Sequence, residues 1–568
     1  MTMSMVRVPA PVPLRRRGGR SRTWWLLAAG WAAQVALRLW LFRQHAGPVA
    51  NPDETGYLIA ARWLAGGPGA DLSGSTFYQG GYPLVLVPVL WFVRDPVVAY
   101  RLVVVVGAMA AAGAFPLAYL LLRRLGTGGR TATVAAFAGG LAPSLLVFSG
   151  LALADAILPT VVLAWLVALH DLAARGSARA GALAGGLGAY AMAVHLRGTV
   201  VLAVTVLALA GLYVARRRAG AVAGLAVAGV VAAAGVLLNR VLSGALYPGG
   251  ARDLSGLLAE RVGGLAGQAW ALAGAAGQLW YLIAATWGLA GVGLAGAAAL
   301  VARRSAPGPH RLLAAVLLAT TLGIAYASSA ALPDEHRVGN HAYGRYLACV
   351  ALAWTLAGLL VLARTGRRAV VWHTLAAAGL LTATGGVVAW YAGDRLRGSA
   401  YIAFDFPEVI FLTRVRDSFD LVAASAVALA LLAALTGAAL LTARRAWPAV
   451  VAVLAVINVA FAADLAPKSA PAAAGADWLP ALTAPGRVAV DRRVRWNVWV
   501  PLSYRVSWTE VEHYDRTPPA GVCTAVVPPD AGPPPEGWAA TGAGGVRQGW
   551  TTWVNDRCPG DGTSARGR

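Results

Sequence analysis

The 568-residue sequence is 58% hydrophobic and only 13% charged, and its mean hydropathy is +0.61. Several apolar runs reach the roughly 20 residues that cross a bilayer, so the composition excludes a soluble protein and predicts a polytopic helical membrane protein. The formal net charge of +23 resembles that of a nucleic-acid-binding protein, but the arginines lie in short loops beside apolar runs. Lys and Arg in such loops mark the cytoplasmic side of a membrane, and we expect no nucleic-acid partner.

Residues 1–23 are rich in arginine and precede an apolar run from Trp24 to Phe42. The run is long, and no small-residue cleavage site follows it before residue 51, so we interpret it as a retained first transmembrane helix and not as a signal peptide. Residues 1–23 are then cytoplasmic. The segment after this helix, residues 44–97, forms the first outer loop.

The first outer loop contains two adjacent carboxylates, Asp53 and Glu54. Pro52 suits the first turn of a helix, and residues 57–64 have helical spacing with one apolar side. This pattern predicts a short helix in the interface plane, with its acidic start at the membrane face. One interpretation is a helix N-terminal signal without function; the position at a membrane mouth, in a chain poor in acids, favours function.

Apolar runs and arginine-rich loops then alternate to about residue 463. The run 82–93 is too short to span comfortably and is expected to be re-entrant or juxtamembrane. The longer runs predict about 13 transmembrane helices within residues 24–465. The arginines of residues 1–23 place the N-terminus in the cytoplasm, and an odd number of crossings then places the C-terminal tail outside.

Acidic residues are distributed unevenly in this topology. Asp171 is the exception on the inner side, and the side of Asp95 depends on how the run 82–93 folds. Because the positive-inside rule counts Lys and Arg and not acids, this asymmetry independently indicates an acid-lined cavity on the outer face. The acids placed outside are Asp53, Glu54, Asp71, Asp155, Asp253, Glu260, Asp334, Glu335, Asp394, Asp405, Glu408 and Asp417.

The tail, residues 466–568, is rich in Pro, Gly and polar residues and follows a Pro- and Ala-rich linker at 466–476. The segments 488–490 and 496–500 have strand-like composition. We expect a small extracytoplasmic α+β domain with a disordered end near residues 561–568. The predicted fold class is therefore an all-α polytopic membrane protein with a small α+β C-terminal domain.

The three cysteines divide between the tail and the membrane part. Cys523 and Cys558 lie in the tail, where an oxidising compartment would permit them to pair. Cys349 lies in an apolar run and is expected to be a small core residue.

Known soluble catalytic motifs are absent from the sequence: it contains no Gly-rich phosphate loop followed by Lys-Ser/Thr, no Gly-x-Ser-x-Gly and no His-Glu-x-x-His. The residues 334–336 with His341 could be imagined as a metal cluster. Carboxylates and histidines in a solvated loop need no metal, so we predict no metal ligands. A divalent cation remains possible as a cofactor but is not predicted.

The motif Pro-Asp-Glu-x-x-Tyr at residues 52–57, just after the first transmembrane helix, resembles the GT-C membrane glycosyltransferases. The branch it resembles holds the bacterial aminoarabinose transferases and the protein O-mannosyltransferases. The segment Gly-Gly-Tyr-Pro-Leu at 80–84 is similar to the family's Pro-Leu segment, with the usual double proline reduced to Tyr-Pro.

Two later segments extend the resemblance over most of residues 24–465. Ala-Pro-Ser at 142–144, followed by Asp155, is similar to the family's second outer acidic position. Gly-Arg-Tyr at 344–346 is similar to its Arg-Tyr segment at the start of a late helix. The expected odd helix count and outer C-terminal domain also fit a GT-C-like fold.

The resemblance implies transfer of a sugar from a polyprenyl-phosphate donor to an acceptor hydroxyl of a lipid, glycan or protein, at the extracytoplasmic face and with inversion. An acceptor hydroxyl needs a positioned base, and we assign this role to Asp53. Glu54 is the less favoured base or a positioning group. Asp155 would orient sugar or acceptor hydroxyls, with a helix cap as the alternative interpretation.

The leaving group of such a reaction is a lipid phosphate, which the planar fork of an arginine grips with two hydrogen bonds. Arg345, beside Tyr346, is the first choice for this contact, with Arg197 and His195 second. The alternative for Arg345 and its flanking tyrosines is an interfacial anchor, and the alternative for residues 195–197 is a simple helix-end turn.

Two rival functions are a transporter or flippase and a non-catalytic binder of a lipid-linked sugar. A transporter is expected to place charges near the bilayer midplane, whereas the predicted helix interiors are almost free of charge, with Arg38 near an end. A binder would need the same arginines but not Asp53. The pattern therefore favours chemistry at the interface.

Overall fold

The structure is a computed structural model, which describes residues 18–50, 52–215, 218–442, 445–466, 487–505, 511–545 and 549–558. The predicted linker beyond residue 466 and the predicted disordered end near 561–568 lie outside the described residues. Residues 1–17 of the predicted cytoplasmic segment also lie outside them.

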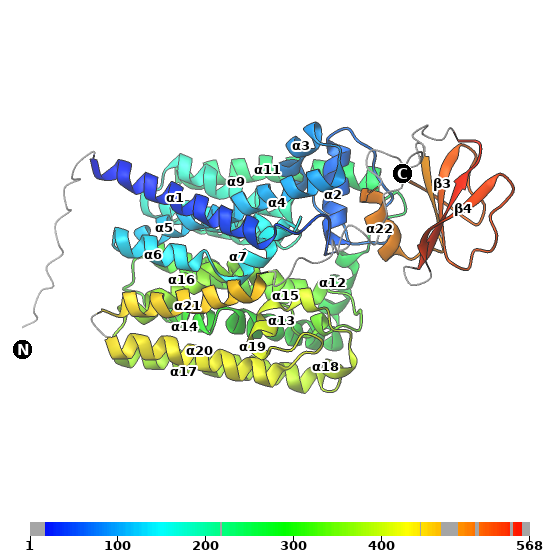
Figure 1. Ribbon diagram of the computed structural model, residues 1–568. Coiled ribbons are helices and arrows are strands. Elements are labelled where there is room, and N and C mark those ends of the chain that lie inside the picture. Colours follow the sequence, from blue (N-terminus) through cyan, green and yellow to red (C-terminus); the bar gives the residue numbers. More distant parts are fainter. Residues whose placement is uncertain are drawn as a thin grey trace, which may run out of the picture.

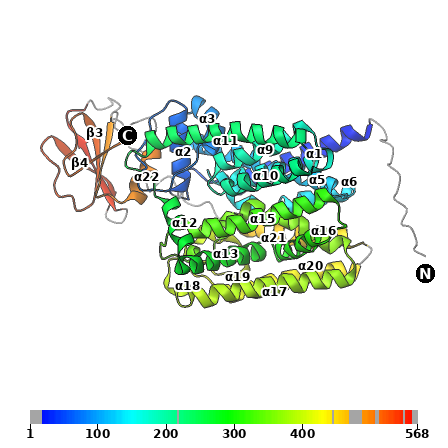
Figure 2. The ribbon, with the colours of Figure 1, turned by 180° about the vertical axis from the view of Figure 1, so that it is seen from behind.

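Long helices run side by side in one elongated bundle, and the C-terminal domain lies beyond the end opposite the start of α1 (Gly18–Leu41) (Figures 1 and 2). We call this end of the bundle the domain end. Among the described residues, eight helical spans are long and apolar enough to cross a membrane. They are α4–α5 (Pro96–Arg124), α8 (Leu158–Arg175), α11 (Arg218–Leu246), α15 (Gly308–Ala331), η4–α16 (Arg345–Arg364), α17 (Arg367–Ala392), α20 (Leu421–Thr442) and α21 (Ala446–Leu465).

Two further spans are bent: α6 (Gly129–Gly139) meets α7–η1 (Pro143–Gly150) at 64°, and α13 (Leu265–Ala285) meets α14 (Leu289–Ala302) at 113°. They raise the number of candidate crossings to ten in the described part of the chain. The multi-pass membrane protein is thus confirmed. The count of about 13 stays a prediction, because three helices fall short of the same length or hydropathy: α1 (Gly18–Leu41), α9 (Ala178–Val194) and α10 (Gly198–Val214).

Polar side chains hold the two broken spans in shape. Arg38 of α1 donates from Nη2 to the carbonyl of Gly140 (2.7 Å), and Asn458 of α21 donates from Nδ2 to the carbonyl of Ala138 (2.9 Å). Asn458 also accepts from Nε1 of Trp287 at the second break (2.8 Å). Backbone groups freed by a break in a membrane need such partners. The buried Arg38 is therefore fully explained as a support for the α6–α7 break.

Helices α9 and α11 cross at very short range through glycines. A Cβ on Gly181 would overlap the carbonyl of Gly220, and a Cβ on Gly185 would overlap the carbonyl of Gly224. Small residues at helix crossings let the backbones approach in this way.

Gly185→Leu is therefore expected to force α9 and α11 apart and to destabilise the bundle by at least ~2 kcal/mol, at the upper end of overpacking costs. The matched control is Gly229→Leu on α11, where an added Cβ meets nothing within 4 Å. Thermal unfolding of the detergent-solubilised variants, followed by size-exclusion chromatography, measures the difference. Equal melting of both variants would contradict the tight crossing.

The domain end carries the short helices α2 (Asp53–Leu64), α3 (Gly81–Phe92), α12 (Leu254–Gly263) and α18 (Arg395–Gly398) (Figures 1 and 2). The other short elements between the spans are η2 (Ala154–Ala156), η3 (Val338–Asn340), η5 (Ala403–Asp405) and α19 (Pro407–Thr413). Helix α3 is too short to span, as predicted for the run 82–93, and its Trp91 and Phe92 are exposed. Figure 1 shows α2 running across the direction of the long helices.

The C-terminal domain is a five-stranded sheet of order β2-β1-β3-β5-β4 with one helix, α22. The elements are β1 (Arg487–Asp491), α22 (Trp496–Arg505), β2 (Val511–Tyr514), β3 (Val522–Val527), β4 (Trp538–Gly545) and β5 (Trp550–Asn555). Strand β1 runs parallel to β2 and β3, whereas β5 is antiparallel to β3 and β4. Cys523 and Cys558 form a disulfide, and Cys349 is a buried core residue. The predicted small α+β domain is confirmed.

The predicted strand at 488–490 is correct, but the one predicted at 496–500 is wrong. Those residues begin α22, because Val494, Val498 and Leu502 recur every four residues and pack on one face of the sheet.

Candidate active site

Helix α2 begins at Asp53, and its extent agrees with the short helix predicted from the sequence. The structure buries residues 54–62 on nearly all sides of the helix, whereas one apolar side was expected. Helices α3 and α22 both pack against α2. The first turn of α2 therefore has a fixed position at the domain end.

Four predicted site residues meet in one continuous ion-pair network. Arg345 donates from Nη1 to Oδ2 of Asp53 (2.6 Å) and from Nε to Oδ2 of Asp155 (2.9 Å). Arg197 pairs with the other oxygen of Asp155 and donates from Nη1 to the carbonyl of Arg345 (2.6 Å). These residues come from α2, η2, the start of α10 and η4, which are far apart in the sequence.

The two carboxylates of this network differ in access. The side chain of Asp53 is 30% exposed, and its Oδ1 accepts a hydrogen bond from the hydroxyl of Tyr78 (3.0 Å). The side chain of Asp155 is only 2% exposed. Asp53 is therefore the carboxylate that a substrate can reach.

Asp155 is held between two guanidinium groups. Burial alone would raise the pKa of Asp155, but Arg197 and Arg345 outweigh it and bring this pKa below its usual range. Asp155 does not cap α8, whose N-cap is Ile157. This geometry fits a carboxylate that positions the two arginines.

Glu54 points away from Asp53 into the protein. Its two oxygens accept four hydrogen bonds of 2.6 Å, from the amides of Val49, Ala50 and Ala152 and from the hydroxyl of Tyr100. A carboxylate offers about four acceptor positions, so Glu54 has none left for a substrate. Its contacts support the positioning role over the role of base.

His195 and Tyr346 surround Arg197. The Nδ1 of His195 accepts from the amide of Arg197 (3.2 Å), and the guanidinium of Arg197 lies 5.6 Å from the ring centroid of Tyr346. Burial, followed by the charge of Arg197, lowers the pKa of His195 well below its usual value. A neutral His195 adds no charge for phosphate binding. Arg345 itself is buried and ion-paired, which is unlike an interfacial anchor.

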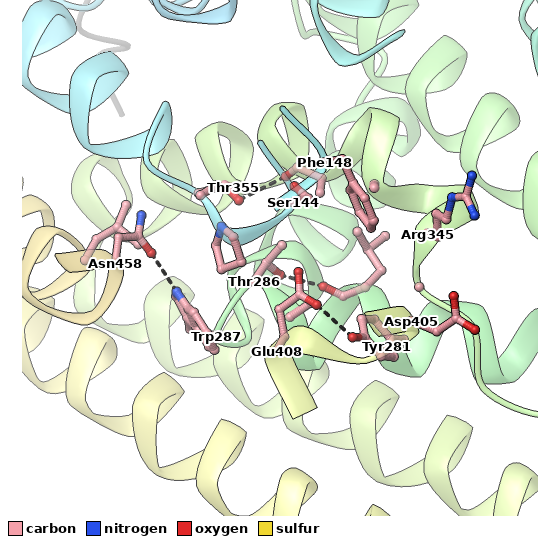
Figure 3. A pocket seen from close by; sticks show the side chains of 18 residues that line it. Ser144, Phe148, Tyr281, Thr286, Trp287, Arg345, Thr355, Asp405, Glu408 and Asn458 are labelled. Carbon is pink, nitrogen blue, oxygen red and sulfur yellow. Dashed lines mark hydrogen bonds between the residues drawn. The ribbon is translucent and has the colours of Figure 1, made fainter. Parts of the chain in front are cut away.

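A cavity opens beside Arg345 and extends between α7, α13, α16, α19 and α21 (Figure 3). Arg345 and Asp405 lie at one end of it, and Trp287 and Asn458 lie at the other. Its walls are mostly apolar. Asp405 and Glu408 also line it, although sequence reasoning placed them only among the outer acids; their short spacing in an aromatic-rich loop is the one signal that could have singled them out.

These two acids are held partly neutral. Burial raises the pKa of Asp405 to about 6, against the opposing effect of Arg345 and Arg337. Burial also raises the pKa of Glu408 to about 7, although the hydroxyl of Tyr281 donates to its Oε2 (2.7 Å). Glu408 is therefore partly protonated near neutral pH, so the cavity offers one carboxyl group that can donate a hydrogen bond as well as accept one.

The raised pKa of Glu408 predicts a pH-dependent stability. A carboxyl with pKa 4.5 unfolded and about 7 folded stabilises the fold below pH 4.5, and this contribution is lost as the pH rises to about 7. The loss is about 3 kcal/mol by pH 8. The melting temperature of Glu408→Gln should therefore be close to that of wild type at pH 5 and higher than that of wild type at pH 8. Thermal unfolding at both pH values tests this, and a parallel pH response of the two proteins would refute it.

Among the described residues, no three His, Cys, Asp or Glu side chains lie close enough together to hold a metal ion. In the loop at 334–341, Glu335 pairs with Arg252 and Arg337, and His336 is exposed. The positive charge between Asp53 and Asp155 belongs to the guanidinium of Arg345.

No protein-family model matches the sequence, and no curated protein sequence matches it. Among solved structures, the chain is similar to ArnT from Cupriavidus metallidurans bound to undecaprenyl phosphate, with TM-score 0.54 and 16% identity over 95% of this chain and 98% of that one. The apo state of the same protein gives TM-score 0.51 and 16% identity, with 94% and 98% covered.

A weaker likeness is to arabinosyltransferase EmbB from Mycobacterium smegmatis, with TM-score 0.42 and 15% identity over 94% of this chain and 48% of that one. ArnT is an aminoarabinose transferase of the GT-C class. The GT-C-like fold implied by the sequence resemblance is therefore confirmed.

Proposed function

We propose that the protein is a membrane glycosyltransferase that moves a hexose or pentose from a polyprenyl-phosphate donor to an acceptor hydroxyl, with inversion at the anomeric carbon. The observation that carries this proposal is the contact between Asp53, an accessible carboxylate, and Arg345, a buried guanidinium. The reaction needs a base for the acceptor and a cation for the leaving phosphate within one small site. The undecaprenyl phosphate bound to ArnT, which has the same fold, supports a lipid phosphate as the donor's leaving group.

In the proposed reaction, the acceptor oxygen forms a bond to the anomeric carbon while the bond from that carbon to the phosphate oxygen breaks. Asp53 takes the proton of the acceptor hydroxyl, and the electron pair of the broken bond leaves on the lipid phosphate. Arg345 uses Nη1 and Nε for Asp53 and Asp155, and its Nη2 donates to no described residue. This nitrogen would donate to the oxygen on which charge grows as the phosphate leaves.

The apolar lining of the cavity beside Arg345 supports a donor that carries a hydrocarbon chain. Undecaprenyl phosphate should therefore bind the purified protein at least ~10-fold more tightly than undecaprenol, because the phosphate gains charge-assisted hydrogen bonds. Native mass spectrometry with both lipids measures the difference. Equal binding of the phosphate and the alcohol would contradict the proposed donor.

We further propose that the domain end faces the cell exterior and that the N-terminus is cytoplasmic. The disulfide between Cys523 and Cys558 supports this orientation, because such bonds persist in oxidising compartments. Cys523→Ser frees Cys558, which a membrane-impermeant maleimide should label in intact cells. Labelling only after the cells are opened would show that the domain end faces the cytoplasm, which contradicts the proposed orientation.

A further inference from the structure

The C-terminal domain makes its firmest contact with the membrane part through α22. On one side, Val498 and Leu502 of α22 pack with Val488 and Val490 of β1, so the helix is fixed to the sheet. On the other side, α22 packs against α2, the helix that begins with Asp53. Figures 1 and 2 show α22 between the sheet and α2.

Tyr504, near the end of α22, belongs to the core of the membrane part and not to that of the sheet. Its hydroxyl donates to the carbonyl of Pro96, the first residue of α4 (2.8 Å). Its own carbonyl lies 3.5 Å from Nη1 of the buried Arg62, in the last turn of α2. Arg62 also donates from Nε to the carbonyl of Pro68 (2.8 Å), so it joins α2, the following loop and α22.

The C-terminal domain also lies near the loop that follows α2. His513 of β2 packs against Trp499 of α22, with ring centroids 4.7 Å apart, and lies within electrostatic reach of Asp71 in this loop. The same loop carries Tyr78, whose hydroxyl donates to Asp53. The C-terminal domain thus packs against α2 and lies near the loop that carries Tyr78.

We propose that the C-terminal domain is a positioning element for the site, in which Tyr504 and Arg62 hold α2 so that Asp53 lies against Arg345. The expected effect on sugar transfer rests on the proposed function, whereas the restraint of α2 by α22 does not. Asp53 and Arg62 are nine positions apart, so a rigid helix carries the constraint over roughly 14 Å. A misplacement of about 1 Å in an active site can cost ~10²-fold in rate.

The test compares Tyr504→Ala with Tyr514→Ala in the full chain. Tyr514 is a buried tyrosine of the same domain, but it lies on the face of the sheet opposite α22, and its hydroxyl has no partner among the described residues. Tyr504→Phe, which keeps the ring and removes the hydroxyl that donates to Pro96, guards against misfolding of the Ala variant. Hydrogen exchange of peptides from α2 and from α8 is measured in each protein.

Tyr504→Ala should speed exchange in α2 at least ~10-fold and leave α8 unchanged, with a smaller effect for Tyr504→Phe and none in α2 for Tyr514→Ala. The kcat for transfer should fall ~10–100-fold in Tyr504→Ala, while undecaprenyl phosphate binding stays within about threefold of wild type. Unchanged exchange in α2, or the same change in Tyr514→Ala, would overturn the inference. Absence of transfer by the wild type would refute the proposed function and leave the exchange result to decide the positioning role.

Discussion

Asp53→Asn is expected to reduce sugar transfer at least ~100-fold, the lower range for loss of a positioned base, while undecaprenyl phosphate binding changes little. The substitution keeps the shape of the side chain and its acceptance of the Tyr78 hydrogen bond, but it removes the proton acceptor. It also removes the negative charge next to Arg345, which leaves that guanidinium freer for phosphate. The readout is the initial rate of transfer from a radiolabelled polyprenyl-phosphate sugar.

The matched control for this substitution is Asp394→Asn. Asp394 is an exposed acid in the turn before α18 at the same end of the bundle, and its side chain caps no helix. It should retain wild-type transfer. If Asp53→Asn kept more than a third of the wild-type rate, Asp53 would not be the base, and Asp405, which lines the cavity together with Arg345, would become the next candidate.

Arg345→Lys is expected to reduce transfer ~10²–10³-fold, the effect of losing a preorganised donor to a developing oxyanion. Lysine keeps the positive charge. Its single ammonium group lacks the planar fork with which arginine hydrogen-bonds to Asp53, Asp155 and a phosphate at the same time. Removing the charge altogether would leave buried carboxylates poorly paired and could unfold the protein. The lysine variant therefore separates phosphate binding from stability.

The control for Arg345→Lys is Arg397→Lys, an exposed arginine of α18. The control should match wild type in transfer, in undecaprenyl phosphate binding and in elution from a size-exclusion column. Arg345→Lys should elute like wild type and bind the lipid phosphate at least ~10-fold more weakly. Wild-type binding and transfer by Arg345→Lys would exclude this residue from the phosphate site.

The sequence predicts the membrane fold well because the need to bury apolar surface and to place arginines in short loops decides it. It also predicts that Asp53, Asp155 and Arg345 gather at one face, although the chain separates Asp155 from Arg345 by 190 positions. The acid asymmetry and the family resemblance both point to that face. The ion pairs between these residues are tertiary contacts that no local pattern specifies.

Two adjacent residues show most clearly what the sequence alone does not predict. Asp53 and Glu54 are chemically alike and share one helix turn, yet Asp53 faces the site and Glu54 faces the amide of Ala152. The tertiary contacts of the two side chains decide which is which. The segment 496–500 misleads for a different reason, since its Val and Trp residues favour strands, while burial on the sheet favours the helical spacing of α22.

The most direct test of the account is sugar transfer by the purified wild-type protein from a panel of radiolabelled polyprenyl-phosphate hexoses and pentoses, with the corresponding nucleotide sugars in parallel. The account predicts transfer from at least one lipid-linked donor, none from the nucleotide sugars, and an inverted anomeric configuration in the product. Specific binding of the lipid donors without transfer from any of them would contradict it and indicate a carrier or binding protein.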